Sequence, residues 1–274
     1  MSNNNLPHFL CIGAQKAATS WLWTMLRQHP DIWMPPFKEI HYFDHLFVPA
    51  NRKWTHSHIK ENVRSKLRWQ LAQKDNIDLE YFKYLIDVAV TDPFTEDWYR
   101  GCFNRKSAQG KVIGDITPEY STIPSEGISY IKELCGEHIK IIYILREPVD
   151  RALSQIRMNL SRHHNGTLTP TVWMKYATDP IIKQRGDYKT YIPKWKENIP
   201  KNNLLIVDYA NVKENPNKVL SEICDFLSID SFVFPSAQER IHKSKVFKVP
   251  ASVLDYLKEE LSDQTTAYNN EFSK

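Results

Sequence analysis

A short stretch near the N-terminus, GAQKAATS (13–20), combines residue types that bind anions. It follows an apolar segment and precedes a helical pattern, and backbone N–H groups at the start of a helix attract negative charge. Lys16 adds a full positive charge, and Thr19 and Ser20 add hydroxyl donors. A loop for a nucleoside triphosphate with magnesium needs lysine directly before the hydroxyl residue, where this chain has Ala18. The stretch therefore predicts a phosphate loop of another kind, with a plain strand-to-helix turn as the alternative.

A second stretch, REPVDRALS (146–154), stands in the same way behind the apolar run 139–145. An arginine at the end of a strand can hold a phosphate through two parallel hydrogen bonds. Ser154, two helical turns later, is placed to add a hydrogen bond to the same group. The alternative is that Arg146 pairs with Asp150 and that Ser154 is an ordinary surface residue.

Rigid elements must hold these stretches, and the hydrophobic pattern indicates strands that alternate with helices. The expected strands are His8–Ile12, Val112–Ile116, Lys140–Leu145 and Asn203–Asp208. The expected helices are Thr19–Gln28, Ser125–Cys135, Pro148–Arg162 and Pro216–Leu227. Thr19 or Ser20 is available to cap the first helix. The pattern predicts an α/β fold, a P-loop-like doubly wound parallel sheet flanked by helices.

Two regions interrupt this alternation, and we expect both to lie over the C-terminal edge of the strands, where ligands bind in open α/β sheets. Residues 46–110 form a polar and aromatic insertion with helical stretches at 59–74 and 81–90. Residues 163–200 form a substrate-side segment rich in Lys, Tyr and Trp. Because no linker rich in Pro, Gly or Ser divides the chain, residues 1–274 are expected to form a single domain.

Composition excludes several classes of protein. With 274 residues, 42% of them apolar and 25% charged, the chain can build a sizeable core and is not disordered. A net charge of +4 suits an anionic ligand and falls short of a nucleic-acid-binding domain. No apolar run approaches the roughly 20 residues that cross a bilayer, and no signal peptide is visible, so we expect a cytoplasmic protein. Four scattered cysteines predict reduced thiols, with neither a disulfide scaffold nor a structural zinc site.

The two anion-binding stretches follow one another as strand-GxxKxxTS-helix and strand-REPxxRxxS-helix. In this order they resemble the sulfotransferases that use 3′-phosphoadenosine-5′-phosphosulfate (PAPS). The likeness extends to HPDIWMPPFKEIHYFD (29–44), EDWYRGCF (96–103), GDITPEYS (114–121), GDYKTYIPKW (186–195) and the segment 202–230. It is a likeness to the carbohydrate-type and bacterial branch, including heparan sulfate sulfotransferases, rather than to the branch that sulfates small phenols.

The resemblance implies a set of donor-binding residues. They are Lys16, Ala17, Ala18, Thr19, Ser20, Trp21, Arg146, Ser154 and Tyr188. Lys16 would contact the 5′-phosphate and neutralise the leaving oxygen, while Arg146 and Ser154 would hold the 3′-phosphate. Family members usually carry glycine at position 17 or 18, so alanine makes this loop stiffer. Relatives close a loop over the cofactor near the position of the basic stretch 240–248.

Sulfuryl transfer needs a base, because the acceptor oxygen or nitrogen loses its proton as its bond to sulfur forms. The segment KEIHYF (38–43) resembles a family element in which glutamate is that base, which assigns the role to Glu39. His41 would orient it or serve as a second candidate, and Asp115 would support the same cleft. From the residues alone, Glu39 could instead be a solvated carboxylate paired with Lys38, and His41 a buried histidine.

Other features bear on the acceptor and on metals. Many polysaccharide-active relatives carry lysine where this chain has Ile116, which argues against a heparan-like acceptor. The basic stretch 52–74, with interleaved tryptophans, is either a solvated helix face or a lid for an anionic or sugar-like acceptor. The pairs His56/His58 and His163/His164 are expected to be exposed. No catalytic metal is expected, because no HExxH motif or tight His/Cys cluster occurs.

These features predict an in-line sulfotransferase. It would move a sulfuryl group from PAPS to a hydroxyl or amine of a small-molecule or carbohydrate acceptor and release adenosine 3′,5′-bisphosphate (PAP). No nucleic-acid or membrane partner is expected, while the acceptor and the oligomeric state stay open. The first alternative is a P-loop nucleotide or small-molecule kinase that needs ATP and magnesium. The second is a catalytically silent nucleotide-binding protein that binds PAP and transfers nothing.

Overall fold

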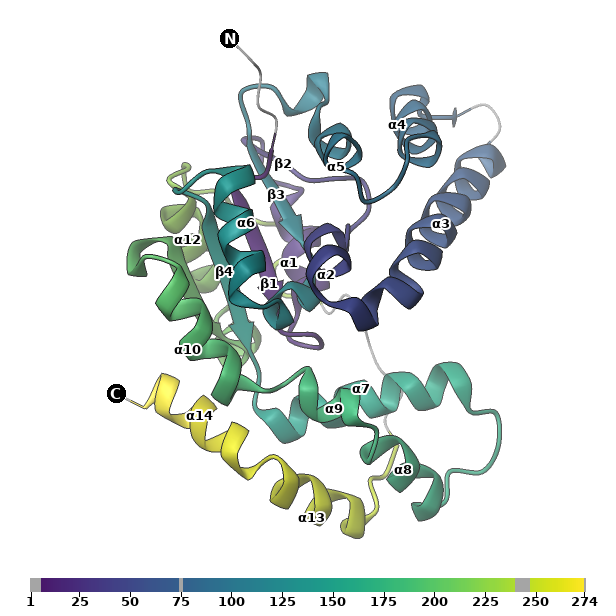
Figure 1. Cartoon of the computed structure of the whole chain (residues 1–274), viewed down its shortest axis with the longest axis vertical. Helices are drawn as coiled ribbons and strands as arrows, with labels where there is room; N and C mark the ends of the chain where they lie inside the picture. Colours follow the sequence, from purple (N-terminus) through teal and green to yellow (C-terminus); the bar gives the residue numbers. More distant parts are fainter. Residues whose placement is uncertain (1–5, 74–75, 240–246, 274) are drawn as a thin grey trace.

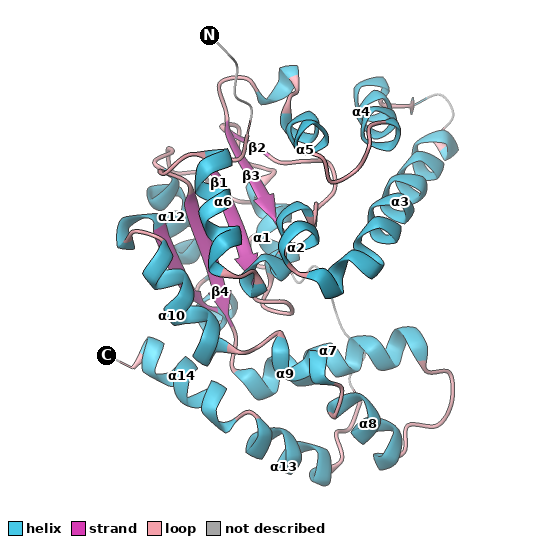
Figure 2. Cartoon of the chain, viewed as in Figure 1, coloured by secondary structure: helices cyan, strands magenta, loops and turns pink. Residues whose placement is uncertain are grey.

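A parallel sheet of five strands forms the centre of the protein (Figures 1 and 2). The computed structural model describes residues 6–73, 76–239 and 247–273. The strand order is β2-β3-β1-β4-β5, and every neighbouring pair is parallel. The strands are β1 (Phe9–Gly13), β2 (Ile32–Trp33), β3 (Val112–Ile116), β4 (Lys140–Leu145) and β5 (Leu204–Asp208).

Helices flank this sheet and extend beyond it (Figure 2). They are α1 (Thr19–Leu26), α2 (Tyr42–Phe47), α3 (Pro49–Ala72), α4 (Leu79–Val90), α5 (Glu96–Phe103), α6 (Ser125–Cys135), α7 (Pro148–His163), α8 (Pro170–Ala177), α9 (Pro180–Gln184), α10 (Tyr188–Asn198), α11 (Tyr209–Glu214), α12 (Pro216–Leu227), α13 (Ala251–Glu260) and α14 (Ser262–Phe272). The predicted α/β class, with a parallel sheet between helices, is therefore confirmed.

The two central strands are buried on both faces, which explains their continuous apolar sequences. Every residue of β1 is buried, and so is every residue of β4 except Lys140 at its start. A parallel strand that is covered by helices on both sides needs such a run rather than an alternating one. The predicted boundaries of β3 and β4 are correct to the residue, whereas β1 and β5 each begin one residue later than expected. β2 escaped prediction because a two-residue strand leaves no periodic pattern.

The order of the strands places the topological switch point of the sheet between β1 and β4. From β1 the chain adds β2 and β3 on one side of the sheet and then β4 and β5 on the other. The loops that leave β1 and β4 therefore diverge at the C-terminal edge, which is where open α/β sheets bind ligands. The stretch 13–20 follows β1 and Arg146 follows β4, so both predicted anion-binding stretches meet at this point.

The two insertions occupy different places around this edge. In Figure 1, α8 and α9 lie beyond the arrowheads of the strands, whereas α3 and α4 lie side by side at one flank. The segment 163–200 is not all over the edge, since α10 packs beside α6 and α14. A second, smaller apolar cluster joins α7, α8 and α13. The assignment of residues 1–274 to a single domain stays a prediction.

We predict that Gly114→Ala lowers the free energy of unfolding by about 2 kcal/mol or more, a typical result of overpacking a core. Gly114 faces Phe9 across the β1–β3 ladder, and a Cβ atom would lie 2.1 Å from Cζ of that ring. Gly101 in α5 is the matched control, because its Cβ would meet nothing within 4 Å. There, alanine should raise stability by about 0.5–1 kcal/mol. Urea unfolding of both variants checks this, and changes of the same sign would contradict it.

Candidate active site

The loop after β1 is held in an unusual backbone conformation. Lys16 and Ala18 have left-handed φ values of 73° and 63°, and Ala18 is the N-cap of α1. A left-handed conformation costs about 1–2 kcal/mol in any residue but glycine. The glycine that the family resemblance implies at position 17 or 18 would relieve this strain at position 18. The prediction that Thr19 or Ser20 caps α1 is wrong, because both lie inside the helix and accept hydrogen bonds from Lys38 instead.

The Lys16 ammonium lies in a cluster of positive charges. Its Nζ is 3.5 Å from the thioether sulfur of Met158, which is a weak acceptor. Burial lowers the pKa of Lys16 to about 8, and the nearby charges of Arg162, Arg146 and Lys38 add to this effect. A cluster of like charges this close to a loop of backbone N–H groups is stabilised by a bound anion.

Arg146 reaches across from the end of β4 to the loop after β1. Its Nη1 donates to the carbonyl of Lys16 at 3.0 Å, and its guanidinium stacks 4.6 Å from the ring centroid of Tyr209. Tyr188 fixes its backbone, since the hydroxyl accepts from Arg146 N at 3.2 Å and donates to Arg146 O at 3.0 Å. The Nε of Arg146 is buried without a partner within the described ranges. The alternative pairing with Asp150 is not found there either.

The other predicted donor residues are placed less directly. Ala17 is fully buried, and Ser154 is partly exposed on α7, two turns beyond Arg146. Trp21 is buried in α1, and its indole N–H donates to the carbonyl of Ala237 at 2.9 Å. Tyr188 is fully buried behind Arg146, so the geometry makes it a support for that arginine. The roles of all of them toward a donor stay predictions.

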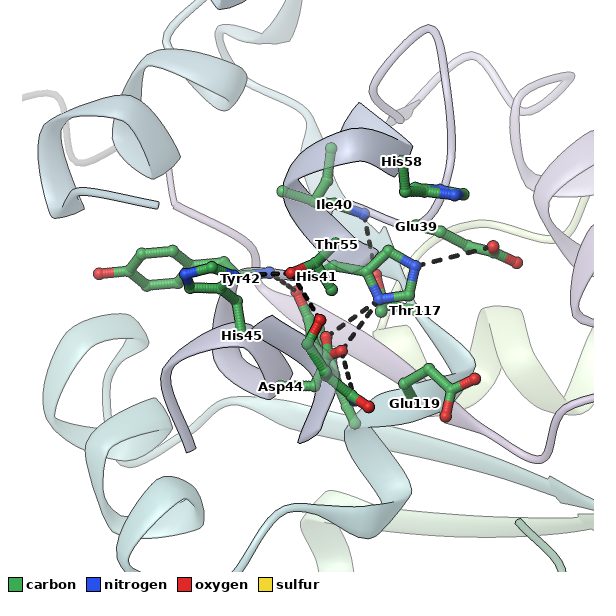
Figure 3. Close-up of polar contacts among 12 residues, drawn as sticks. Glu39, Ile40, His41, Tyr42, Asp44, His45, Thr55, His58, Thr117 and Glu119 are labelled. Atoms are coloured by element: carbon green, nitrogen blue, oxygen red, sulfur yellow. Dashed lines mark hydrogen bonds and ion pairs between the residues drawn. The ribbon is translucent and has the colours of Figure 1, made fainter. Parts of the chain in front are cut away.

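The segment after β2 brings a carboxylate and an imidazole to the same edge (Figure 3). Glu39 and His41 are also left-handed, with φ values of 68° and 57°. Backbone contacts to the β3 loop hold them, because Glu39 N donates to Ile116 O at 3.1 Å and Ile40 N to Thr117 Oγ1 at 3.1 Å. The Thr117 hydroxyl in turn donates to Asp115 at 2.9 Å. Asp115 therefore supports the site from behind.

Glu39 and His41 form part of a chain of charges. Oε1 of Glu39 is 3.0 Å from Lys38 Nζ, and Oε2 is 3.8 Å from His41 Nε2. On its other side, His41 Nδ1 lies 3.1 Å from both carboxylate oxygens of Asp44. Asp44 is fully buried and also accepts from Asn51 at 2.9 Å. The alternative pairing of Glu39 with Lys38 is thus present, and it occurs inside the site rather than in solvent.

These contacts set the protonation states of Glu39 and His41. Burial alone would raise the pKa of Glu39, but the charges of Lys38 and His41 hold it well below its usual range. Burial alone would lower the pKa of His41, but Asp44 and Glu39 raise it to about 10. At neutral pH the site therefore contains an ionised glutamate beside a protonated imidazole.

Sequence reasoning missed several contributors. Asp44 follows His41 by three residues, the helical spacing that brings side chains together, and this signal was available. No sequence signal links Glu119 and Arg185, yet Arg185 Nη2 lies 2.6 Å from the Glu119 carboxylate. Arg185 Nη1 also donates to Oε1 of Gln15 at 3.0 Å, which ties the loop after β1 to the segment that follows α9.

In each histidine pair, one member is exposed and the other is partly buried. His56 and His163 are exposed as expected, and His164 is partly buried. His58 is also only half exposed, which corrects the prediction for this pair. The first turns of α3 pack on α2, so the His58 ring meets the His41 ring edge-on at 4.8 Å between centroids.

The structure also places the basic residues of α3 and the four cysteines. Most of the basic residues in 52–73 are exposed along α3, and Trp69 is 56% exposed. The four cysteines are free, as predicted. No helix in the described ranges is long and apolar enough to span a bilayer. Most of the basic stretch 240–248 lies outside the described residues.

The parallel sheet, with a left-handed loop after β1 that contacts an arginine after β4, is a P-loop-like α/β fold. Within that class, a family model described as "Sulfotransferase family" matches residues 7–233. The chain therefore belongs to the sulfotransferase family, which is a family of transferases.

Curated relatives are distant in sequence. Human heparan sulfate glucosamine 3-O-sulfotransferase 3B1 is 23% identical over 237 residues, covering 84% of this chain and 48% of the relative. The membrane-associated sulfotransferase kil1 of Dictyostelium discoideum is 24% identical over 182 residues, covering 66% of this chain and 28% of the relative. The chain thus spans about half the length of the first of these relatives, at 48%, and less of the second.

Solved structures show the same fold over nearly the whole chain. A sulfotransferase from Alicyclobacillus acidocaldarius superposes with a TM-score of 0.66 at 19% identity, covering 98% of this chain and 96% of that one. The sulfotransferase domain of the Synechococcus PCC 7002 olefin synthase gives a TM-score of 0.59 at 17% identity, covering 100% and 98%.

The charged neighbours of His41 predict how the free energy of unfolding depends on pH. His41 has a folded pKa of about 10, above its ordinary value of 6.5, so folding favours its protonated form. This contribution is complete below pH 6.5 and is lost as pH rises toward 10, because the folded state then binds the extra proton. We expect urea unfolding of the wild type to show this decline and His41→Asn to lack that part of it. Equal slopes in both proteins would contradict the prediction.

Proposed function

We propose that the protein transfers a sulfuryl group from PAPS to a hydroxyl or amine, with Glu39 as the general base. The observation that supports this most strongly is the arrangement at the C-terminal edge. There, Lys16 and Arg146 converge from β1 and β4, and Lys38 joins the hydroxyls of the first loop to the Glu39 carboxylate. A donor anion held by the first group would lie beside the base.

On the donor side, the chain offers positive charge and hydrogen-bond donors for two phosphates. Lys16 and the start of α1 suit the 5′-phosphosulfate, because the helix N-terminus and the ammonium both stabilise negative charge there. Arg146 suits the 3′-phosphate, since its buried Nε is without a partner in the described part of the chain. Ser154 would add a hydroxyl from α7.

In the proposed reaction, the acceptor oxygen or nitrogen attacks sulfur while the bond from sulfur to the bridging oxygen breaks. The acceptor proton passes to Glu39, and the bonding electrons leave with the 5′-phosphate of PAP. Lys16 stabilises the charge that develops on that oxygen. The protonated His41, held by Asp44, places a positive charge 3.8 Å from Oε2 of Glu39. No step requires a metal ion.

The acceptor is proposed only as a class. Relatives named as heparan sulfate 3-O-sulfotransferases suggest a sugar hydroxyl, and the exposed basic residues of α3 suit an anionic acceptor. Ile116, in place of the lysine of polysaccharide-active relatives, favours a smaller acceptor than heparan.

A kinase is the weaker proposal, because Ala18 stands where a magnesium-dependent phosphate loop has lysine. A cytoplasmic location stays a prediction.

Calorimetric titration tests the donor site. The wild type should bind PAP more tightly than AMP and without magnesium, because Arg146 serves the phosphate that AMP lacks. Arg146→Ala should weaken PAP binding by about 2 kcal/mol, roughly thirtyfold, and AMP binding far less. Arg146→Lys should fall between, since it keeps the charge and loses the planar fork. Equal weakening of both nucleotides would refute the assignment, and tighter binding of Mg-ATP would favour a kinase.

Glu39→Gln tests the base. Glutamine keeps the shape of the side chain and cannot accept the proton, so transfer to a responsive acceptor should fall at least about 100-fold. PAP binding should not weaken, because glutamine leaves the Lys38 ammonium free to contact the donor anion. The readout is product formation from PAPS over a panel of sugars, phenols and amines, with PAP affinity measured in parallel. A parallel loss of affinity and turnover would show a structural role instead.

A further inference from the structure

Glu39, His41 and His58 offer one ligand atom each, and these atoms all lie within 4.8 Å of one another. The residues come from two elements, the loop after β2 and helix α3, and Figure 3 shows their side chains grouped around one space. Two imidazoles and a carboxylate are a common ligand set for zinc with an open coordination position. We propose that this cluster binds a divalent transition-metal ion of the zinc class.

The two histidines are already oriented as metal ligands usually are. His41 donates from Nδ1 to the Asp44 carboxylate at 3.1 Å, and the ion takes the place of the proton that Nε2 carries at neutral pH. His58 Nε2 lies 2.9 Å from the side-chain amide of Asn62, and turning that amide so that its oxygen accepts from Nε2–H leaves the other ring nitrogen for the ion. Such contacts fix the ring of a ligating histidine and are typical of built metal sites.

His41 provides a separate indication of a missing partner. It is 1% exposed, and its Nε2 is a buried polar atom without a hydrogen-bond partner in the described part of the chain. The nearest carboxylate oxygen, Oε2 of Glu39, is 3.8 Å away, which is too far for a hydrogen bond. Two ligands on one zinc ion lie roughly 3–3.5 Å apart, so an ion needs only a small closure of this gap.

The surroundings suit a borderline-soft ion rather than magnesium or calcium. Imidazole ligands favour zinc, copper and nickel, whereas magnesium and calcium require mostly oxygen ligands. The Lys38 ammonium is a competing cation, but it contacts Oε1 of Glu39 and leaves Oε2 toward the cluster. Trp54 packs edge-on against His41 at 4.7 Å between centroids and limits access of water from that side.

Binding at this cluster has a consequence that rests on the proposed function. An ion on Glu39 would occupy the carboxylate that must accept the acceptor proton. Metal binding and sulfuryl transfer therefore exclude each other, and the ion acts as a reversible inhibitor rather than as a catalyst. This differs from a catalytic metal, which the proposed reaction does not use.

The test is a titration of the untagged, metal-free chain with Co²⁺ as a visible probe, followed by competition with Zn²⁺. We expect one equivalent of Co²⁺ to give the intense bands of a low-coordinate site, with displacement by Zn²⁺ and not by Mg²⁺. His58→Ala and Glu39→Gln should each weaken binding at least about tenfold. His56→Ala is the matched control, because its exposed ring lies two residues away on the same helix, and it should bind as the wild type does.

Three results would overturn the proposal. They are no saturable binding by the wild type, an equal loss in the His56 and His58 variants, and unchanged binding in both cluster variants. Far-UV circular dichroism of each variant confirms that it is folded. The titration contains no nucleotide, so its failure leaves the PAPS proposal intact, and failure of PAP binding leaves this one intact.

Discussion

The site depends on one charged side chain, Lys38. Its ammonium has three N–H donors and contacts three side chains, at 3.0 Å from Glu39, 3.2 Å from Thr19 and 3.1 Å from Ser20. Lys38 is only 17% exposed, so the carboxylate and the hydroxyls replace much of the water that the charge would otherwise hold. Through it, the loop after β2 is joined to the loop after β1. The site therefore exists only because the parallel sheet holds β1 and β2 in fixed positions relative to each other.

The two loops are strained where they meet. Lys16, Ala18, Glu39 and His41 all have positive φ, although none of them is glycine. Each such residue costs about 1–2 kcal/mol, so the surrounding contacts must outweigh several kcal/mol. The carbonyl of Lys16 receives Arg146 and the backbone of Glu39 donates to Ile116, so neighbouring strands hold the strained residues in place. A strained segment that is held this way keeps its side chains ready for one geometry.

Sequence alone predicted the sheet and its helices and brought the two basic stretches to one edge, because long apolar runs and the order of basic residues are local signals. It could not predict β2, which is two residues long, or the packing of His58 against His41, which depends on how α3 meets α2. It named Glu39 and His41 through resemblance and missed Asp44, whose role rests on burial and on a 3.1 Å contact. The predicted N-cap of α1 was wrong because the hydroxyls of Thr19 and Ser20 accept hydrogen bonds from Lys38, which lies in another loop.

The charge of Lys38 poses a chemical difficulty that the proposed reaction resolves. A glutamate whose pKa is held well below its usual range is a weak base, and general-base catalysis weakens as the pKa falls. The contacts of Lys38 with Thr19 and Ser20 place it beside the loop that would hold the phosphosulfate. A bound anion there competes with Glu39 for the same ammonium, and any loss of that contact raises the pKa of Glu39. In the proposed reaction, donor binding would thus strengthen the base, and Glu39 would become effective only when a sulfuryl group is present to be transferred.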